Sequence, residues 1–175
     1  MADVVVVSGA PGAGKSTLAR PLAAALGLPL LAKDVIKESL FDQLGHVDGD
    51  ERVSSQRLGA AAMELLWRLA ADGPAVVIEA NFRTTSAYER ERLLALSDRP
   101  VEVFCRVPPQ LALARFEQRA TSPGHHPVHV ARTLPPEVLA EFAEPFGIGP
   151  VIEVDTARPV DVDAVAAAVR AALGG

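Results

Sequence analysis

The feature that most constrains the fold is a glycine-rich segment close to the start of the chain. It follows the β-branched run Val4–Val7 and opens a helical pattern over Lys15–Leu26. Its residues are Gly9, Ala10, Pro11, Gly12, Ala13, Gly14, Lys15, Ser16 and Thr17, which match the pattern G-x-x-x-x-G-K-[ST]. In such a strand–loop–helix unit, the glycines let successive backbone N–H groups turn inward as a nest for phosphate oxygens. The segment therefore predicts a phosphate-binding loop.

Each remaining residue type in this loop has a chemical role. Lys15 is placed to reach the β- and γ-phosphates of a nucleotide, and the Ser16 hydroxyl is placed to ligate Mg²⁺. The helix that follows adds unpaired N–H groups and the positive end of its dipole. ATP and Mg²⁺ are the expected cofactors, and a glycine-rich turn without a ligand is the alternative.

Short apolar runs alternate with longer helical patterns along the whole chain. After Val4–Val7, strands are predicted over Leu28–Ala32, Ala75–Ile78, Val101–Val107 and Val151–Val154. Helices are predicted over Lys15–Leu26, from 34 to 44, 54 to 71, 86 to 96, 108 to 119, 135 to 142 and 162 to 173. Such alternation predicts parallel strands joined by βαβ crossovers. We expect one α/β domain over residues 1–175, a three-layer P-loop NTPase fold with a five-stranded parallel sheet, helices on both faces and a short lid at about 115–135.

The amino-acid composition limits the kinds of partner that the protein is expected to bind. The chain is 49% hydrophobic and 22% charged, as expected of a folded domain, and its net charge of −5 disfavours general binding to nucleic acid or membranes. Cys105 is the single cysteine, which excludes an intrachain disulfide and a site of several thiolates. No apolar stretch approaches the roughly 20 residues that cross a bilayer, and the start does not resemble a signal peptide. We expect a soluble, cytoplasmic protein.

Missing motifs narrow the class of nucleotide-binding protein. The chain contains no Asn-Lys-x-Asp segment of the kind that selects guanine in GTPases, which disfavours a Ras-like switch. Its 175 residues leave no room for the additional domains of a mechanical ATPase. A small nucleotide-dependent phosphotransferase fits the size better.

Asp34 is the best candidate for the acceptor site of such an enzyme. It follows the second predicted strand, at the carboxyl edge of the sheet where open α/β folds bind ligands. A carboxylate at this position could accept the proton of an attacking hydroxyl. The alternative is helix capping, since Asp is a preferred N-cap residue, although Lys37 stands where a capping box needs Glu or Gln. Position alone leaves both open.

Three polar residues follow the third predicted strand. Glu79 stands where P-loop proteins place an acidic residue, more often Asp, toward the water shell of the metal. Asn81 and Arg83 follow at the same edge and could contact the acceptor or stabilise a turn. The segment from Gly45 to Arg57, with the lid, would complete the acceptor pocket, which makes Arg57 a further candidate.

Basic and imidazole side chains cluster near the predicted lid. Arg115 and Arg119 lie one helical turn apart, and Arg132 lies on the far side of a Pro-, Gly- and His-rich stretch. Closure over a triphosphate would give these arginines an anionic partner, whereas a solvated basic face is the alternative. The histidines His125, His126 and His129 are better suited to a loop surface or an acceptor contact than to zinc, because Pro127 interrupts any helix that would align them.

The chain resembles a family of small P-loop kinases related to chloramphenicol phosphotransferase, gluconate kinase and the zeta-type toxins. The resemblance rests on the phosphate-binding loop, Lys33-Asp34-Val35-Ile36-Lys37, Glu79-Ala80-Asn81-Phe82-Arg83, the Arg-bearing helix before the lid, and Val154-Asp155-Thr156. It implies ATP-dependent phosphorylation of a small-molecule hydroxyl, with Asp34 as the proton acceptor. It also implies that Arg115, Arg119 and Arg132 are lid arginines and that Thr156 and Arg158 wall the adenine. Lys33 departs from the family, in which a small or acidic residue often precedes that Asp.

Several functions remain open at this stage. The acceptor could be an antibiotic, a sugar, a nucleoside or a nucleotide-sugar. A nucleotide-gated protein with slow ATPase activity and no acceptor is a second class. A polynucleotide 5′-hydroxyl kinase is a third, disfavoured by the negative charge and by an aromatic content of 5%.

Overall fold

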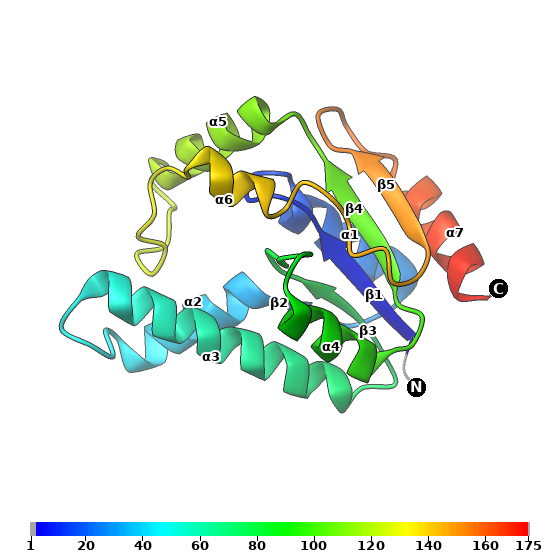
Figure 1. Cartoon of the computed structure of the whole chain (residues 1–175), viewed down its shortest axis with the longest axis horizontal. Helices are drawn as coiled ribbons and strands as arrows, with labels where there is room; N and C mark the ends of the chain where they lie inside the picture. Colours follow the sequence, from blue (N-terminus) through cyan, green and yellow to red (C-terminus); the bar gives the residue numbers. More distant parts are fainter. Residues whose placement is uncertain (1–2, 175) are drawn as a thin grey trace.

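The computed structural model, which describes residues 3–174, contains a five-stranded parallel sheet with strand order β2-β3-β1-β4-β5 (Figure 1). Every neighbouring pair of strands is parallel. The strands are β1 (Asp3–Ser8), β2 (Leu30–Ala32), β3 (Ala75–Glu79), β4 (Val101–Arg106) and β5 (Val151–Asp155). The predicted α/β class and the five-stranded parallel sheet are therefore confirmed.

Helices cover both faces of this sheet (Figure 1). They are α1 (Lys15–Leu26), α2 (Lys33–Leu44), α3 (Glu51–Ala71), α4 (Ala87–Leu96), α5 (Pro109–Ala120), α6 (Pro136–Ala140) and α7 (Val162–Leu173). One core lies between the sheet and α1 with α7, and a second lies between the sheet and α3 with α4.

The valines of β1 explain how one strand serves both cores. Successive side chains of a strand point to opposite faces, so Val5 and Val7 enter the first core while Val4 and Val6 enter the second. All four are fully buried. A continuous β-branched run is the pattern expected of a central parallel strand covered on both sides.

Two helix boundaries differ from those predicted by two residues or more, and the others agree to within one residue. Helix α3 begins at Glu51 rather than Ser54, because the Asp50 side chain caps it by accepting a hydrogen bond from the Val53 N–H. Helix α6 ends at Ala140 rather than Phe142, and the chain then continues through turns.

The elements that surround the phosphate-binding loop extend beyond the sheet. Helices α2 and α3 form an antiparallel pair at one end of the molecule, and the connection between α5 and α6 descends toward it (Figure 1). We call this connection, residues 121–135, the lid loop. Within residues 3–174, the helices are too short or too polar for any of them to cross a bilayer.

Candidate active site

Two positions of the phosphate-binding loop, Gly9 and Gly12, leave no room for a side chain. Gly9 and Gly12 have φ values of 132° and 82°, a region that side chains disfavour. A Cβ on Gly9 would lie 2.6 Å from the carbonyl oxygen of Cys105 in β4, and a Cβ on Gly12 would lie 2.0 Å from that of Ala112 in α5. The loop is therefore pressed between β4 and α5, which holds its amides in one conformation.

Lys15, the first residue of α1, curls back over this loop. Its side chain is buried, and its Nζ donates a 2.8 Å hydrogen bond to the carbonyl oxygen of Ala10. Burial lowers the pKa of the Lys15 ammonium, whereas the nearby carboxylates of Glu79 and Asp34 act in the opposite direction. A cation held in this way is placed to meet the negative charge of a polyphosphate.

A cleft of about 240 Å³ opens beside the loop at the carboxyl edge of the sheet. It brings together Ser16, Asp34, Glu79 and Arg119, which the sequence singles out, and the three histidines of the predicted lid, His125, His126 and His129. The other lining residues are Arg20, Leu30, Ala32, Val35, Glu38 and Gly124. The cleft thus combines a hydroxyl, carboxylates and a guanidinium next to a phosphate-binding loop.

Asp34 lies in the first turn of α2, and Ala32 is the N-cap of that helix. The alternative prediction that Asp34 caps the helix is therefore wrong, and its carboxylate is available to the cleft. The Lys33 Nζ lies 3.1 Å from the carboxylate. Burial alone would raise the pKa of Asp34, but the charges of Lys33 and His129 hold it below its ordinary value. The carboxylate is therefore ionised at neutral pH and able to accept a proton.

Glu79 ends β3 and is buried beside Ser16. Burial raises the pKa of its carboxyl, and the charge of Lys15 and a hydrogen bond from Ser16 partly offset this. The hydroxyl and the carboxylate are both hard oxygen donors, which suits Mg²⁺. Across residues 3–174, no cluster of three or more His, Cys, Asp or Glu could hold a metal.

Two histidines of the lid loop contact carboxylates of α2. His129 Nε2 lies 2.8 Å from the Glu38 carboxylate, and His126 Nε2 lies 3.2 Å from that of Asp42. Between them, the carbonyl oxygen of Val128 accepts a 2.7 Å hydrogen bond from the Ser55 hydroxyl of α3. The lid loop therefore closes one side of the cleft in this structure.

Arg115 and Arg119 share a face of α5, yet they serve different sides of the loop. Arg119 lines the cleft of Asp34, whereas Arg115 donates a 3.0 Å hydrogen bond to the carbonyl oxygen of Thr156. Arg115, Thr156 and Arg158 line a second cavity of about 350 Å³ that also includes Gly14 and Thr17. The Thr156 hydroxyl donates to the carbonyl oxygen of Ala13 over 2.6 Å, which ties this wall to the loop.

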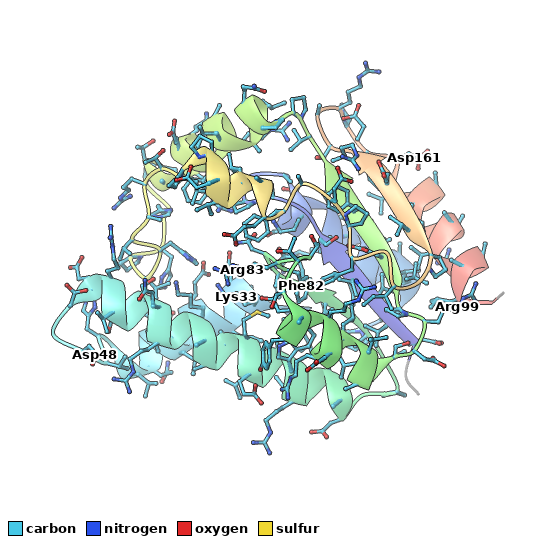
Figure 2. The ribbon with its side chains drawn as sticks, viewed as in Figure 1. Lys33, Asp48, Phe82, Arg83, Arg99 and Asp161 are labelled. Carbon is cyan, nitrogen blue, oxygen red and sulfur yellow. The ribbon has the colours of Figure 1, made fainter. Side chains whose placement is uncertain are left out.

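Four other candidates do not line either cavity. Arg57 pairs with Asp48 over 3.0 Å, Arg83 pairs with Glu141 over 2.8 Å, and both side chains are exposed. Arg132 is exposed and donates to the carbonyl oxygen of Ala120. Asn81 is half-buried just beyond β3. Figure 2 shows Arg83 near the middle of the molecule and Asp48, the partner of Arg57, at the outer end of α2 and α3.

The cleft also contains residues that the sequence analysis missed. Glu38 lies four residues after Asp34, and this helical spacing places both on one face of α2, which is a signal that could have identified it. Lys37, the residue before Glu38, does not line the cleft; it is buried and donates a 2.7 Å hydrogen bond to Ser55, and burial lowers its pKa to about 8. No local pattern indicates that His129 would reach α2, because this contact depends on the path of the lid loop.

The fold and the site together define a P-loop protein of the kinase type, and comparisons with known proteins agree. Residues 4–145 match the family described as AAA domain. A provisionally named kinase from Chloroflexus aurantiacus J-10-fl is 31% identical, with 98% of each chain covered and a TM-score of 0.81. The chain belongs to this AAA-domain family and is one of the small P-loop kinases.

More distant structures share the fold alone. Shikimate kinase from Acinetobacter baumannii, in complex with shikimate, is 19% identical, covering 97% of this chain and 92% of its own, with a TM-score of 0.57. A gluconokinase from Sinorhizobium meliloti 1021 is 18% identical, covering 99% of this chain and 91% of its own, with a TM-score of 0.54. A search of curated proteins found no match.

Proposed function

We propose that the protein is an ATP-dependent phosphotransferase that moves the γ-phosphoryl group to a hydroxyl of a small molecule. The observation that carries the proposal is the composition of a single cleft. Beside the phosphate-binding loop, this cleft holds a hydroxyl and a carboxylate suited to a metal, a second carboxylate suited to a base, and a guanidinium. Kinase chemistry needs these groups around one phosphoryl group.

The phosphate-binding loop and the second cavity suit the two ends of ATP. The loop amides and Lys15 bind the phosphates, and the cavity of Arg115, Thr156 and Arg158 accepts the adenine. Ser16 and Glu79 would hold Mg²⁺, which would supply positive charge to neutralise the phosphate oxygens.

Asp34 acts as the proton acceptor for the attacking hydroxyl. Its carboxylate is ionised because Lys33 and His129 lower its pKa, against the effect of burial. Phosphoryl transfer passes through a loose transition state, so positioning and charge neutralisation contribute more than proton removal. Lys15 and Arg119 supply that neutralising charge. Arg132 takes part only after the lid loop moves, because it now faces the carbonyl oxygen of Ala120.

The experiment that tests this function follows the label of γ-³²P-ATP. Wild-type protein is incubated with Mg²⁺ and a panel of antibiotics, sugars, nucleosides and nucleotide-sugars, and the products are separated. We expect label in one organic product. Label found only in inorganic phosphate would contradict the proposal and leave an ATPase without an acceptor.

The same assay tests the role of Asp34. We expect Asp34→Asn to reduce turnover by about 10²–10⁴-fold, the range typical of a general base. Asp98→Asn is the matched control, because Asp98 is exposed in the connection from α4 to β4, which enters the sheet at the edge opposite the cleft. Equal product formation by wild type and Asp34→Asn would remove Asp34 from this role.

A further inference from the structure

A third cavity, of about 360 Å³, lies between the carboxyl end of β4, the start of α5 and α6. Phe104, Val107, Leu139 and Phe142 supply large apolar walls, and Cys105 and Ala10 complete the side nearest the phosphate-binding loop. Neither the nucleotide nor the metal of the proposed function uses this cavity. Its volume falls within the range of about 300–1,000 Å³ that small-molecule pockets occupy.

The cavity offers no free charge to a ligand. Arg106 and Glu144 are its charged lining residues, and their side chains lie 3.5 Å apart. Arg106 also pairs with Glu153 of β5 over 2.6 Å, and its guanidinium lies over the Phe104 ring at 5.0 Å. Burial raises the pKa of the Cys105 thiol to about 12, so this wall is uncharged as well. A carboxylate or an ammonium group would lose its hydration here without gaining a partner.

The cavity adjoins the reaction centre through the phosphate-binding loop. Ala10 lines it, and the carbonyl oxygen of the same residue accepts the hydrogen bond from Lys15. Gly9 packs so tightly on Cys105 that a methyl group would not fit between them. Lys15 lies within electrostatic range of Cys105 on this side and of Asp34 on the other. The cavity follows β4 and Asp34 follows β2, which are three strand spacings or about 14 Å apart, so a molecule that occupies the cavity and reaches Asp34 must be elongated and cross the front of the loop.

We infer that this cavity binds the uncharged, apolar part of the phosphoryl acceptor, an aromatic ring or an alkyl group, while the acceptor hydroxyl reaches Asp34. The inference rests on the proposed function and narrows its substrate class to hydroxyl compounds with a sizeable apolar group. Sugar acids and other polyols fall outside this class, because most of the cavity wall is apolar and its two charged side chains, Arg106 and Glu144, already pair with each other.

The test measures binding separately from catalysis. 4-Phenyl-1-butanol serves as an apolar hydroxyl probe and gluconate as a charged one, and each is titrated into the protein by ligand-observed NMR in the presence of Mg·ADP. We expect the wild type to bind 4-phenyl-1-butanol and not gluconate. Ala140→Phe places a ring into the cavity from α6 and should weaken binding of the alcohol at least tenfold.

Two further variants separate a filled cavity from a damaged fold. Ala167→Phe, on the exposed face of α7, should bind the alcohol as the wild type does. Leu139→Ala enlarges the cavity and should shift the preference from the phenyl alcohol to the larger 2-(1-naphthyl)ethanol severalfold. Calorimetric binding of Mg·ADP, expected to be unchanged in all three variants, shows that the phosphate-binding loop is intact.

Two results would overturn the inference. One is a wild type that does not bind the phenyl alcohol, or that binds it no better than Ala140→Phe does. The other is displacement of the alcohol by gluconate. These measurements involve no phosphoryl transfer. A failure to label any product from γ-³²P-ATP would therefore refute the kinase activity without affecting the result on ligand binding in the cavity.

Discussion

Replacing Gly12 with alanine tests whether the shape of the phosphate-binding loop depends on its contact with α5. Gly12 has a φ of 82°, and an added Cβ would lie 2.0 Å from the Ala112 carbonyl oxygen and 3.2 Å from the Phe116 nitrogen. Both neighbours are backbone atoms of a helix, so no side-chain rotation can relieve the overlap. Either the loop or α5 must move.

The size of the effect follows from this geometry. Alanine in the left-handed region costs about 1–2 kcal/mol by itself. Removing the overlap with Ala112 requires a further displacement of about 1 Å, which is large relative to the narrow distance range of a good hydrogen bond. Each lost charge-assisted hydrogen bond to a phosphate costs about 1.5–3 kcal/mol. We therefore expect Gly12→Ala to weaken binding of Mg·ATP by about 10- to 100-fold.

Gly27 supplies a matched control. It has a φ of 70° at the end of α1, yet a Cβ at this position would meet no atom within 4 Å. Gly27→Ala therefore carries the backbone cost without the overlap. The assay is urea unfolding of both variants with and without Mg·ATP, which separates the loss of stability from the loss of ligand-induced stabilisation.

The two variants should differ in a specific way. Gly27→Ala should lower the free energy of unfolding by about 1 kcal/mol and keep the full stabilisation by Mg·ATP. Gly12→Ala should lower it further and lose most of that stabilisation. Equal nucleotide-induced stabilisation of the two variants would refute the idea that α5 shapes the loop.

Two further predictions concern the sheet and the lid loop. Glu102 is buried in β4 and accepts hydrogen bonds from the Ser8 hydroxyl and from the Phe146 and Gly147 amides. We therefore expect Glu102→Ala to lower the free energy of unfolding, measured by urea titration, by about 3 kcal/mol or more. A loss below about 1 kcal/mol would contradict this. Burial lowers the pKa of His129 despite the nearby carboxylates of Asp34 and Glu38, with Lys37 also lowering it. The contact of the lid loop with α2 is therefore fully stable above the unfolded pKa of about 6.5 and weakens as the pH falls through the lower, folded pKa. Hydrogen exchange of residues 121–135 should accelerate below about pH 6.5 beyond its intrinsic pH dependence, and a His129→Asn variant with the same acceleration would contradict the assignment.

The fold and the nucleotide side of the site follow closely from the sequence. The strand–loop–helix unit around Gly9–Thr17 is local, and the burial of Val4–Val7 on both faces fixes β1 in the middle of the sheet. Glu79 and Asp34 were found because parallel strands end at the same edge. These inferences need only spacing along the chain and the rules of parallel sheets.

The acceptor side of the site depends on tertiary contacts that the spacing of residues along the chain does not determine. Arg57 was expected in the pocket but pairs with Asp48, which lies in the loop before α3. The histidines have no carboxylate near them in sequence, whereas the folded lid loop brings them to Glu38 and Asp42. Such contacts join a long loop to a distant helix, and the residue types alone do not specify which partner is chosen.

Nucleotide binding by the loop is tested most directly by a calorimetric titration of Mg·ATP into the wild type and into Lys15→Ala. Because the Lys15 ammonium is held over the loop by the Ala10 carbonyl oxygen, we expect saturable 1:1 binding to the wild type and a loss of at least about tenfold in affinity in the variant. No heat of binding with the wild type, or equal affinities for the two proteins, would contradict a phosphate-binding role for this loop.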